Sequence, residues 1–315
     1  MKTILSIIKW ISLGLLALLL VLIAGSSLNH VVQTAREEAT YPPPGELVPV
    51  NDHRLHVYAE GDGDLTLVFM SGSGTAAPVL DFRPLYGRLS DDYRTVVVER
   101  AGYGWSENGG TSRDIDTVLS ETRRALTSAG ESGPYVLLPH SMSALEALHW
   151  ANAYPDEVTG IIGLDPAVPP VYEVMPMPRL TASVASFTSR TGLLRLVPSI
   201  CREAPVAEHL TEADMEAYCS MMVRRTMTSA MLAEVDMIQA NAERVAGEGI
   251  PNVPLFFFIS NGDDVPVENW GEILADYVEA AGGEYHMLDV GHFVHNEAPD
   301  LIAAESRAFL QQIER

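Results

Sequence analysis

The first part of the chain differs from the rest in its hydrophobic pattern. An apolar stretch runs from Ile4 to Ala24, and only Lys9 and two serines interrupt it. At 1.5 Å per residue, a helix over this stretch is long enough to cross a hydrocarbon core of about 30 Å. Residues 1–28 therefore predict a transmembrane anchor or a signal segment. The charged and proline-rich residues 29–45 then predict a linker.

Two lysines bear on the orientation of this segment. Lys2 and Lys9 precede its most apolar half, and positive charges favour the cytoplasmic side of a membrane. We expect a single-pass membrane protein that contacts the bilayer through residues 4–24, with its catalytic domain outside the cytoplasm. The alternative is a secreted protein, because the small residues Gly25 and Ser26 offer a site for signal cleavage.

Beyond residue 46, short apolar blocks alternate with stretches of helical periodicity. The strand-like blocks are residues 54–58, 65–70, 95–98, 135–138, 160–164, 254–259 and 285–288. The helical patterns are residues 116–129, 144–154, 268–281 and 299–313. Continuous apolar strands that alternate with helices indicate an α/β fold with a mostly parallel, doubly wound sheet.

One region departs from this alternation. Residues 169–249 contain no convincing strand pattern, but they include methionine-rich helical segments at 212–225 and 229–245. An all-helical insertion between two strands predicts a cap over the carboxyl edge of the sheet, where the sites of open α/β folds lie. The core is then expected in two parts, residues 46–168 and residues 250–315.

Charge and cysteine content exclude some functions. The net charge of −22 argues against nucleic acid as a partner, because phosphates would be repelled. Cys201 and Cys219 form no CxxC pair, and no histidine and cysteine cluster has the spacing of a zinc site. No metal is expected. A disulfide and two buried free thiols are both compatible with these cysteines.

The strongest chemical signal is a serine between a strand and a helix. Ser141 follows the apolar run 135–138, and the helix-forming run 145–150 comes after it. A sharp turn there exposes the hydroxyl, and the helix N-terminus supplies N–H groups to a developing negative charge. We therefore predict that Ser141 is a nucleophile. The alternative is that it caps the helix.

Four motifs resemble those of the α/β-hydrolase superfamily over about residues 46–315. In chain order they are Met70-Ser71-Gly72-Ser73-Gly74, Glu99-Arg100-Ala101-Gly102-Tyr103-Gly104-Trp105-Ser106, the turn at Ser141, and Gly291-His292-Phe293 followed by Glu297-Ala298-Pro299. The resemblance implies that His292 is the base that activates Ser141. It also implies that the backbone N–H groups of Ser73 and Met142 form an oxyanion hole.

The resemblance leaves the triad acid open among three aspartates. All three satisfy the order serine, acid, histidine, but the resemblance implies that the acid usually follows the seventh strand, where Asp264 and Asp263 lie. Asp165, after the sixth strand block, is ranked below them as a structural residue. The turn also departs from the family pattern, because Pro139 and Ser143 replace its two glycines, and Ser71 replaces the histidine before the oxyanion loop.

These observations predict a serine hydrolase that acts on an ester or amide through an acyl-enzyme, without cofactor or metal. A carboxylesterase-like activity is favoured. The alternatives are a peptidase of the proline-iminopeptidase type and a non-catalytic binding protein that retains the fold. A dinucleotide site is also considered, since Gly72-Ser73-Gly74-Thr75-Ala76-Ala77 follows a strand and Glu99 ends the next one. It is rejected because it leaves Ser141 and His292 unexplained.

Overall fold

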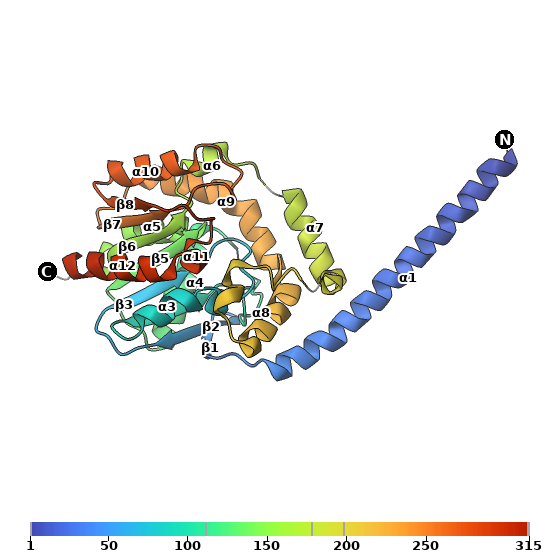
Figure 1. Ribbon diagram of the computed structural model, residues 1–315, viewed down its shortest axis with the longest axis horizontal. Coiled ribbons are helices and arrows are strands. Elements are labelled where there is room, and N and C mark those ends of the chain that lie inside the picture. The colour runs from blue at the N-terminus through green and yellow to red at the C-terminus, as the bar shows by residue number, and fades with distance from the viewer. Residues whose placement is uncertain (1, 111, 178, 198, 314–315) are drawn as a thin grey trace.

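A long N-terminal helix projects from the folded part of the chain. The structure is a computed structural model that describes residues 2–110, 112–177, 179–197 and 199–313. Helix α1 (Lys2–Thr40) is continuous over 39 residues, none of them buried, and its N-terminal half extends away from the rest of the molecule (Figure 1). It is long and apolar enough to cross a membrane, with a mean hydropathy of 2.6 in its most apolar window.

The folded part is built on an eight-stranded sheet. Its strands are β1 (Glu46–Val50), β2 (His53–Glu60), β3 (Thr66–Met70), β4 (Arg94–Glu99), β5 (Tyr135–Ser141), β6 (Val158–Pro166), β7 (Leu255–Ile259) and β8 (Glu284–Met287). They lie in the order β1-β2-β4-β3-β5-β6-β7-β8. The hairpin of β1 and β2 joins β4 in antiparallel fashion, and all other pairs are parallel. The predicted mostly parallel sheet is confirmed.

Helices cover both faces of this sheet. The core helices and turns are α2 (Pro78–Asp81), α3 (Arg83–Leu89), α4 (Ile115–Ser128), α5 (Ser143–Ala153), η1 (Pro155–Glu157), α10 (Trp270–Ala280), α11 (Val294–Glu297) and α12 (Pro299–Ile313). Alternate side chains of the strands enter two apolar cores. Val68 and Val96 pack with α4, α5 and α10 on one face, and Phe69 and Val97 pack with α3 and α12 on the other.

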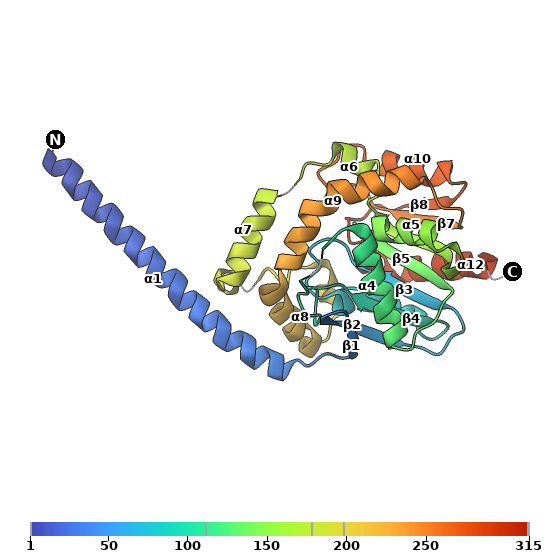
Figure 2. The same ribbon diagram turned by 180° about the vertical axis from the view of Figure 1, so that it is seen from behind.

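The segment between β6 and β7, residues 169–249, is called the cap. Its regular elements among the described residues are the helices and turns α6 (Val171–Val174), α7 (Arg179–Arg190), η2 (Leu193–Leu196), η3 (Pro205–His209), α8 (Glu212–Arg225) and α9 (Ser229–Glu248). Figure 2 shows α7, α8 and α9 at the side of the folded part from which α1 emerges.

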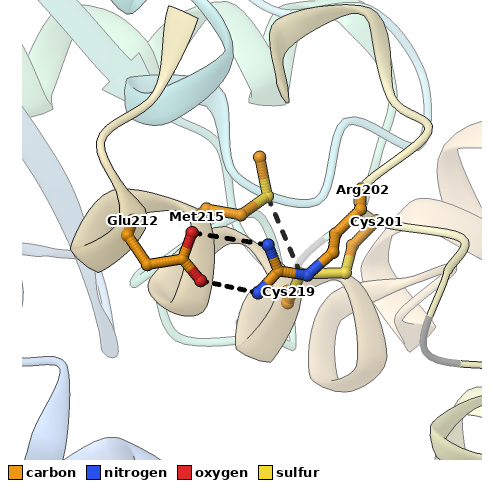
Figure 3. Close-up of a disulfide and its surroundings, with 5 residues drawn as sticks. All are labelled: Cys201, Arg202, Glu212, Met215 and Cys219. Carbon is orange, nitrogen blue, oxygen red and sulfur yellow. Dashed lines mark hydrogen bonds and ion pairs between the residues drawn. A yellow bond between two sulfur atoms is a disulfide. The ribbon is translucent and has the colours of Figure 1, made fainter. Parts of the chain in front are cut away.

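A disulfide joins two parts of the cap. Cys201 bonds to Cys219 on α8 (Figure 3), so the pairing that the sequence leaves open is present in the structure. The Met215 sulfur lies 3.8 Å from Cys219 Sγ, and Arg202 pairs with Glu212 at 2.8 Å. The bond fastens the irregular chain after α7 to α8.

One expected boundary differs from the structure. The sequence predicts a linker from residue 29, whereas α1 continues to Thr40. Residues 33–40 are mostly glutamine, alanine, arginine and glutamate, which are good helix formers. The helix ends just before Pro42 and Pro43, where proline disfavours a helical conformation. The irregular link to β1 is therefore only a few residues long.

Candidate active site

Ser141 lies on a strained turn at the end of a central strand. It is the last residue of β5, and its φ of 54° is in the left-handed region, which costs a non-glycine residue free energy. Met142 and α5 follow directly. The side chain of Ser141 is partly exposed, and no hydrogen bond of its hydroxyl is found within the described chain. The turn thus presents a free hydroxyl at the carboxyl edge of the sheet.

The unusual Ser143 has a structural explanation. Its buried Oγ lies 2.7 Å from the Met70 carbonyl oxygen and 2.9 Å from that of His140. The hydroxyl therefore ties the end of β3 to the turn, in a place where the family pattern has glycine. Gly72 lies close to the same turn, where no side chain fits, because a Cβ there would lie 2.9 Å from Ser141 Cβ and 2.9 Å from His140 Nδ1.

The structure pairs His292 with Asp165. His292 Nδ1 lies 2.6 Å from Asp165 Oδ2, and since a carboxylate only accepts, Nδ1 carries the hydrogen. Asp165 is fully buried and also accepts from Ser260 N at 2.8 Å, Ser260 Oγ at 2.7 Å and Trp270 Nε1 at 2.8 Å. Four donors therefore hold this carboxylate. His292 Nε2 remains as the acceptor of the ring.

The geometry differs from the expected ranking of the three aspartates, because His292 is hydrogen-bonded to Asp165. Asp263 and Asp264 are both exposed, and no hydrogen bond joins either to His292 in the described chain. Asp263 N donates to Asn261 Oδ1 at 3.1 Å, which turns this loop back on itself. Asp264 instead faces the backbone next to His292, since a Cβ on Gly291 would be 2.2 Å from Asp264 Oδ2.

His140 connects the turn to the histidine loop. Its Nε2 donates to the His292 carbonyl oxygen at 3.1 Å, and the two ring centres are 4.7 Å apart. Burial, together with the nearby His292 and His295, lowers the pKa of His140 well below its usual value. No hydrogen bond links Ser141 Oγ to His292 among the described residues, as is common before a substrate binds. His140, with an uncharged ring, therefore holds the loop that carries His292 beside the turn at Ser141.

The predicted oxyanion groups are backbone N–H groups that have no acceptor in the described chain. Arg100 Nη1 donates to the Ser71 carbonyl oxygen at 2.9 Å, and Nη2 lies 3.5 Å from that of Gly72. The C=O and N–H of a trans peptide point in opposite directions. A guanidinium on the Gly72 carbonyl therefore turns the Ser73 N–H to the other side. Met142 N–H lies at the start of α5, where helix N–H groups are free.

Arg100 also joins the oxyanion loop to the cap. Its Nε lies 3.2 Å from Glu234 Oε1 on α9, and Tyr103 Oη donates to Glu234 Oε2 at 2.5 Å. Burial, reinforced by the Glu234 carboxylate, raises the pKa of Tyr103. Glu146 lies 3.6 Å from Arg100, and both line a cavity of about 30 Å³. No sequence motif marks Glu234, because its partner is 134 residues away.

Glu99, which the dinucleotide pattern would use for a ribose, is occupied inside the protein. Its buried carboxylate accepts from Trp105 N at 2.7 Å and Val79 N at 3.2 Å, and His56 Nδ1 lies 3.0 Å away. Gly104 has a φ of 46° and approaches this carboxylate so closely that no Cβ fits. Among the described residues, no group of three or more histidine, cysteine, aspartate or glutamate side chains could hold a metal ion.

Comparison with known proteins agrees with the fold. Residues 67–305 match the sequence model described as "Alpha/beta hydrolase family". The chain is also 31% identical over 325 residues to the uncharacterized protein YbdG of Bacillus subtilis, with 99% of this chain and all of that protein covered.

The chain belongs to the alpha/beta hydrolase family.

Two solved structures share its fold. The enol-lactonase from Burkholderia xenovorans superposes with a TM-score of 0.64 at 19% identity, covering 84% of this chain and 100% of the other. Epoxide hydrolase VrEH1 from Vigna radiata superposes with a TM-score of 0.65 at 20% identity, covering 85% and 97%. At these identities the similarity concerns the fold. Both of these structurally similar proteins are hydrolases.

Proposed function

We propose that this alpha/beta hydrolase is a membrane-anchored serine hydrolase that cleaves an ester by acyl transfer. One observation carries the proposal. A serine with a φ of 54° ends β5. A hydrogen-bonded pair is formed at the same edge of the sheet by Asp165, near the end of the neighbouring strand β6, and His292, in the loop after β8. A nucleophile, a base and an orienting carboxylate are the parts that acyl transfer requires.

Each residue has a defined role in the reaction. Ser141 Oγ attacks the ester carbonyl carbon, while His292 Nε2 takes the hydroxyl proton. The N–H groups of Ser73 and Met142 stabilise the oxyanion. The tetrahedral intermediate then expels the alcohol, which leaves with the proton from His292.

Water resolves the acyl-enzyme in the second half of the reaction. His292 Nε2 takes a proton from the water, the hydroxide oxygen bonds to the acyl carbon, and the carboxylic acid leaves as Ser141 recovers its proton. Asp165 holds the Nδ1–H tautomer throughout and stabilises the imidazolium. The arrangement itself needs no further reactant besides water.

The N-terminal segment suits an anchor. An apolar helix of this length stays in hydrocarbon without further support, and Lys2 and Lys9 favour a cytoplasmic N-terminus. The Cys201–Cys219 disulfide supports a folded part outside the cytoplasm, since disulfides persist in oxidising compartments. The protein is then expected to remain in the membrane fraction after a high-salt wash and to keep Met1. A mature chain beginning near Gly25 or Ser26 would favour the secreted form.

A fluorophosphonate probe tests the enzyme proposal. We expect it to label the wild type and the Ser143→Ala variant, because the Ser143 hydroxyl contacts only backbone carbonyl oxygens. We expect no labelling of Ser141→Ala. Removing a nucleophile typically lowers turnover by about 10⁴-fold or more. Labelling of folded Ser141→Ala would overturn the assignment, and failure to label the wild type would favour a non-catalytic binding protein.

The substrate class is tested separately on the wild type. Acyl esters and lactones of graded chain length are compared with aminoacyl amides, including prolyl amides. We expect the esters to be turned over faster. A preference for prolyl amides would favour the peptidase alternative and leave the role of Ser141 unchanged.

A further inference from the structure

Cap helix α7 carries an apolar stripe on its exposed side. Leu180, Val184 and Phe187 are spaced by four and three residues, which places them on one helix face, and they are 79%, 54% and 51% exposed. Ala182 and Ser186, which lie on the opposite face, are buried. The usual pattern of an amphipathic surface helix is therefore reversed, because its small and polar residues face the protein and its large apolar residues face outward.

This stripe lies beside the end of the predicted membrane span. Gly192, two residues after α7, packs against α1 so closely that a Cβ there would be 2.5 Å from His30 Cβ and 3.0 Å from the Ser26 carbonyl oxygen. The apolar run of α1 ends at Ala24. The chain after α7 therefore contacts α1 within about two helical turns of the end of the span.

Polar contacts hold α1 and the cap together at this place. Arg195 on η2 lies 3.0 Å from His30 Nδ1 and forms an ion pair with Glu37. Arg224 on α8 lies 3.4 Å from Glu38. These contacts give α1 a defined direction relative to the cap. Figures 1 and 2 show α7 running crosswise to α1, on the side of the folded part toward which the free half of α1 points.

We propose that α7 and the turn that follows it lie in the headgroup region of the lipid bilayer that α1 crosses. The proposal rests on the proposed anchor. A helix that runs across the span lies parallel to the membrane surface, and an exposed apolar stripe is what such a helix buries at the acyl boundary. Leu196, Val197 and Ile200 extend the apolar surface with 72%, 50% and 39% exposure.

The charges near α7 fit the same partner. Arg179 and Arg190 are its first and last residues. Arg179 also lies 3.5 Å from Asp236 on α9, and 63% of its side chain is exposed. Basic side chains beside an apolar stripe are typical of interfacial helices, because they contact lipid phosphates. Two basic residues at the ends of this stripe, in a chain whose net charge is −22, favour a lipid surface over a second, equally acidic copy of the chain.

The proposal has a consequence for the candidate site. Helix α9 packs against α7 and carries Glu234, the carboxylate that binds Arg100 behind the oxyanion loop. The cap then lies between the bilayer and Ser141. A bilayer contact at α7 therefore holds the cap, and with it the cover of the site, at the lipid surface.

Site-directed fluorescence in the full chain tests the contact. A single cysteine is introduced as Phe187→Cys, Leu301→Cys or Leu15→Cys, labelled with the polarity-sensitive dye NBD without reducing the native disulfide, and reconstituted into phosphatidylcholine and phosphatidylglycerol vesicles. Leu301 is the control, since it is 39% exposed on α12, far from α1 (Figure 1). Leu15 reports on the span itself.

We expect the dye at residue 187 to show blue-shifted emission and to be quenched by lipids that carry a doxyl group near the headgroup, while the dye at residue 301 is quenched only by aqueous iodide. If residue 187 behaves like residue 301 while residue 15 is quenched by lipid, the interfacial contact is refuted and the anchor stands. A blue shift at residue 187 without lipid quenching indicates a protein partner and also refutes it. Lipid quenching at neither residue 15 nor residue 187 refutes both proposals. None of these outcomes depends on catalysis.

Discussion

Replacing Asp165 by asparagine separates its two functions, which are to hold neighbouring groups and to orient His292. Ser260 N and Trp270 Nε1 both donate to Oδ1. The single oxygen of an asparagine must therefore occupy the Oδ1 position, because an NH₂ group there would face two donors. The NH₂ group is left at the Oδ2 position, 2.6 Å from His292 Nδ1. Nδ1 must then accept, so the ring hydrogen moves to Nε2.

A histidine with its hydrogen on Nε2 is unable to take the proton of Ser141. The equivalent change in a serine protease lowers kcat by about 10⁴-fold, which corresponds to about 5.4 kcal/mol of activation free energy. Hydrogen bonds to a charged group contribute about 1.5–3 kcal/mol each. The amide keeps the two bonds at the Oδ1 position and loses the two charged bonds at Oδ2, which cost about 4.5 kcal/mol together. Its NH₂ group donates instead to His292 Nδ1 and Ser260 Oγ, which returns about 2 kcal/mol, so we expect Asp165→Asn to lower the free energy of unfolding by about 2–3 kcal/mol and to remain folded.

Turnover of an ester substrate is measured beside Asp264→Asn and Asp263→Asn, with urea unfolding of each variant. The exposed carboxylates of the controls make no hydrogen bond to His292, so we expect less than a tenfold change in kcat. If Asp165→Asn keeps most of its turnover, or if a folded Asp264→Asn loses 10³-fold or more, the proposed acid is wrong. The second result would show that Asp264 comes to His292 when substrate binds.

Three other positions give simple tests. Gly72→Ala should lower turnover at least tenfold, because its Cβ would displace the turn beside His140. Its control, Gly87→Ala, meets no atom within 4 Å and should raise the free energy of unfolding by about 0.5–1 kcal/mol. Kinetic assays and urea unfolding compare the two variants. Native His140 stays neutral because its pKa is lowered, while the unfolded chain takes up a proton below pH about 6.5. The wild-type free energy of unfolding should therefore fall as the pH drops through 6.5. In His140→Gln, the change in this free energy with pH should be smaller by up to about 1.4 kcal/mol per pH unit, as measured by unfolding at several pH values. An unchanged pH dependence would contradict this account. Cys201→Ser removes the disulfide that closes a loop of 18 residues and should lower the free energy of unfolding by about 3 kcal/mol. Unfolding with and without dithiothreitol tests this, since only the wild type should respond to the reductant.

The pattern of short apolar blocks was sufficient to predict most of the core. The blocks at 65–70, 95–98 and 254–259 match β3, β4 and β7 within one residue, and the helix expected over 212–225 coincides with α8. Burial on both faces makes such strands continuously apolar, so that they are visible in the sequence. The edge strand β1 was not predicted, because its sequence Glu-Leu-Val-Pro-Val is short and includes a proline, as edge strands often do.

The sequence by itself determined the elements, their alternation, the membrane-length helix and the candidate pair Ser141 and His292, because each depends on local pattern or on a short motif. The pairing of His292 with Asp165 and not with Asp264 required the tertiary structure, since it depends on where the histidine loop lies and on donors such as Trp270, 105 residues away. The same holds for the link from Arg100 to Glu234 and for the outward stripe of α7, because contacts between distant segments leave no periodic signal in the chain. The sequence therefore shows which chemical groups are available, whereas tertiary packing decides which of them come into contact.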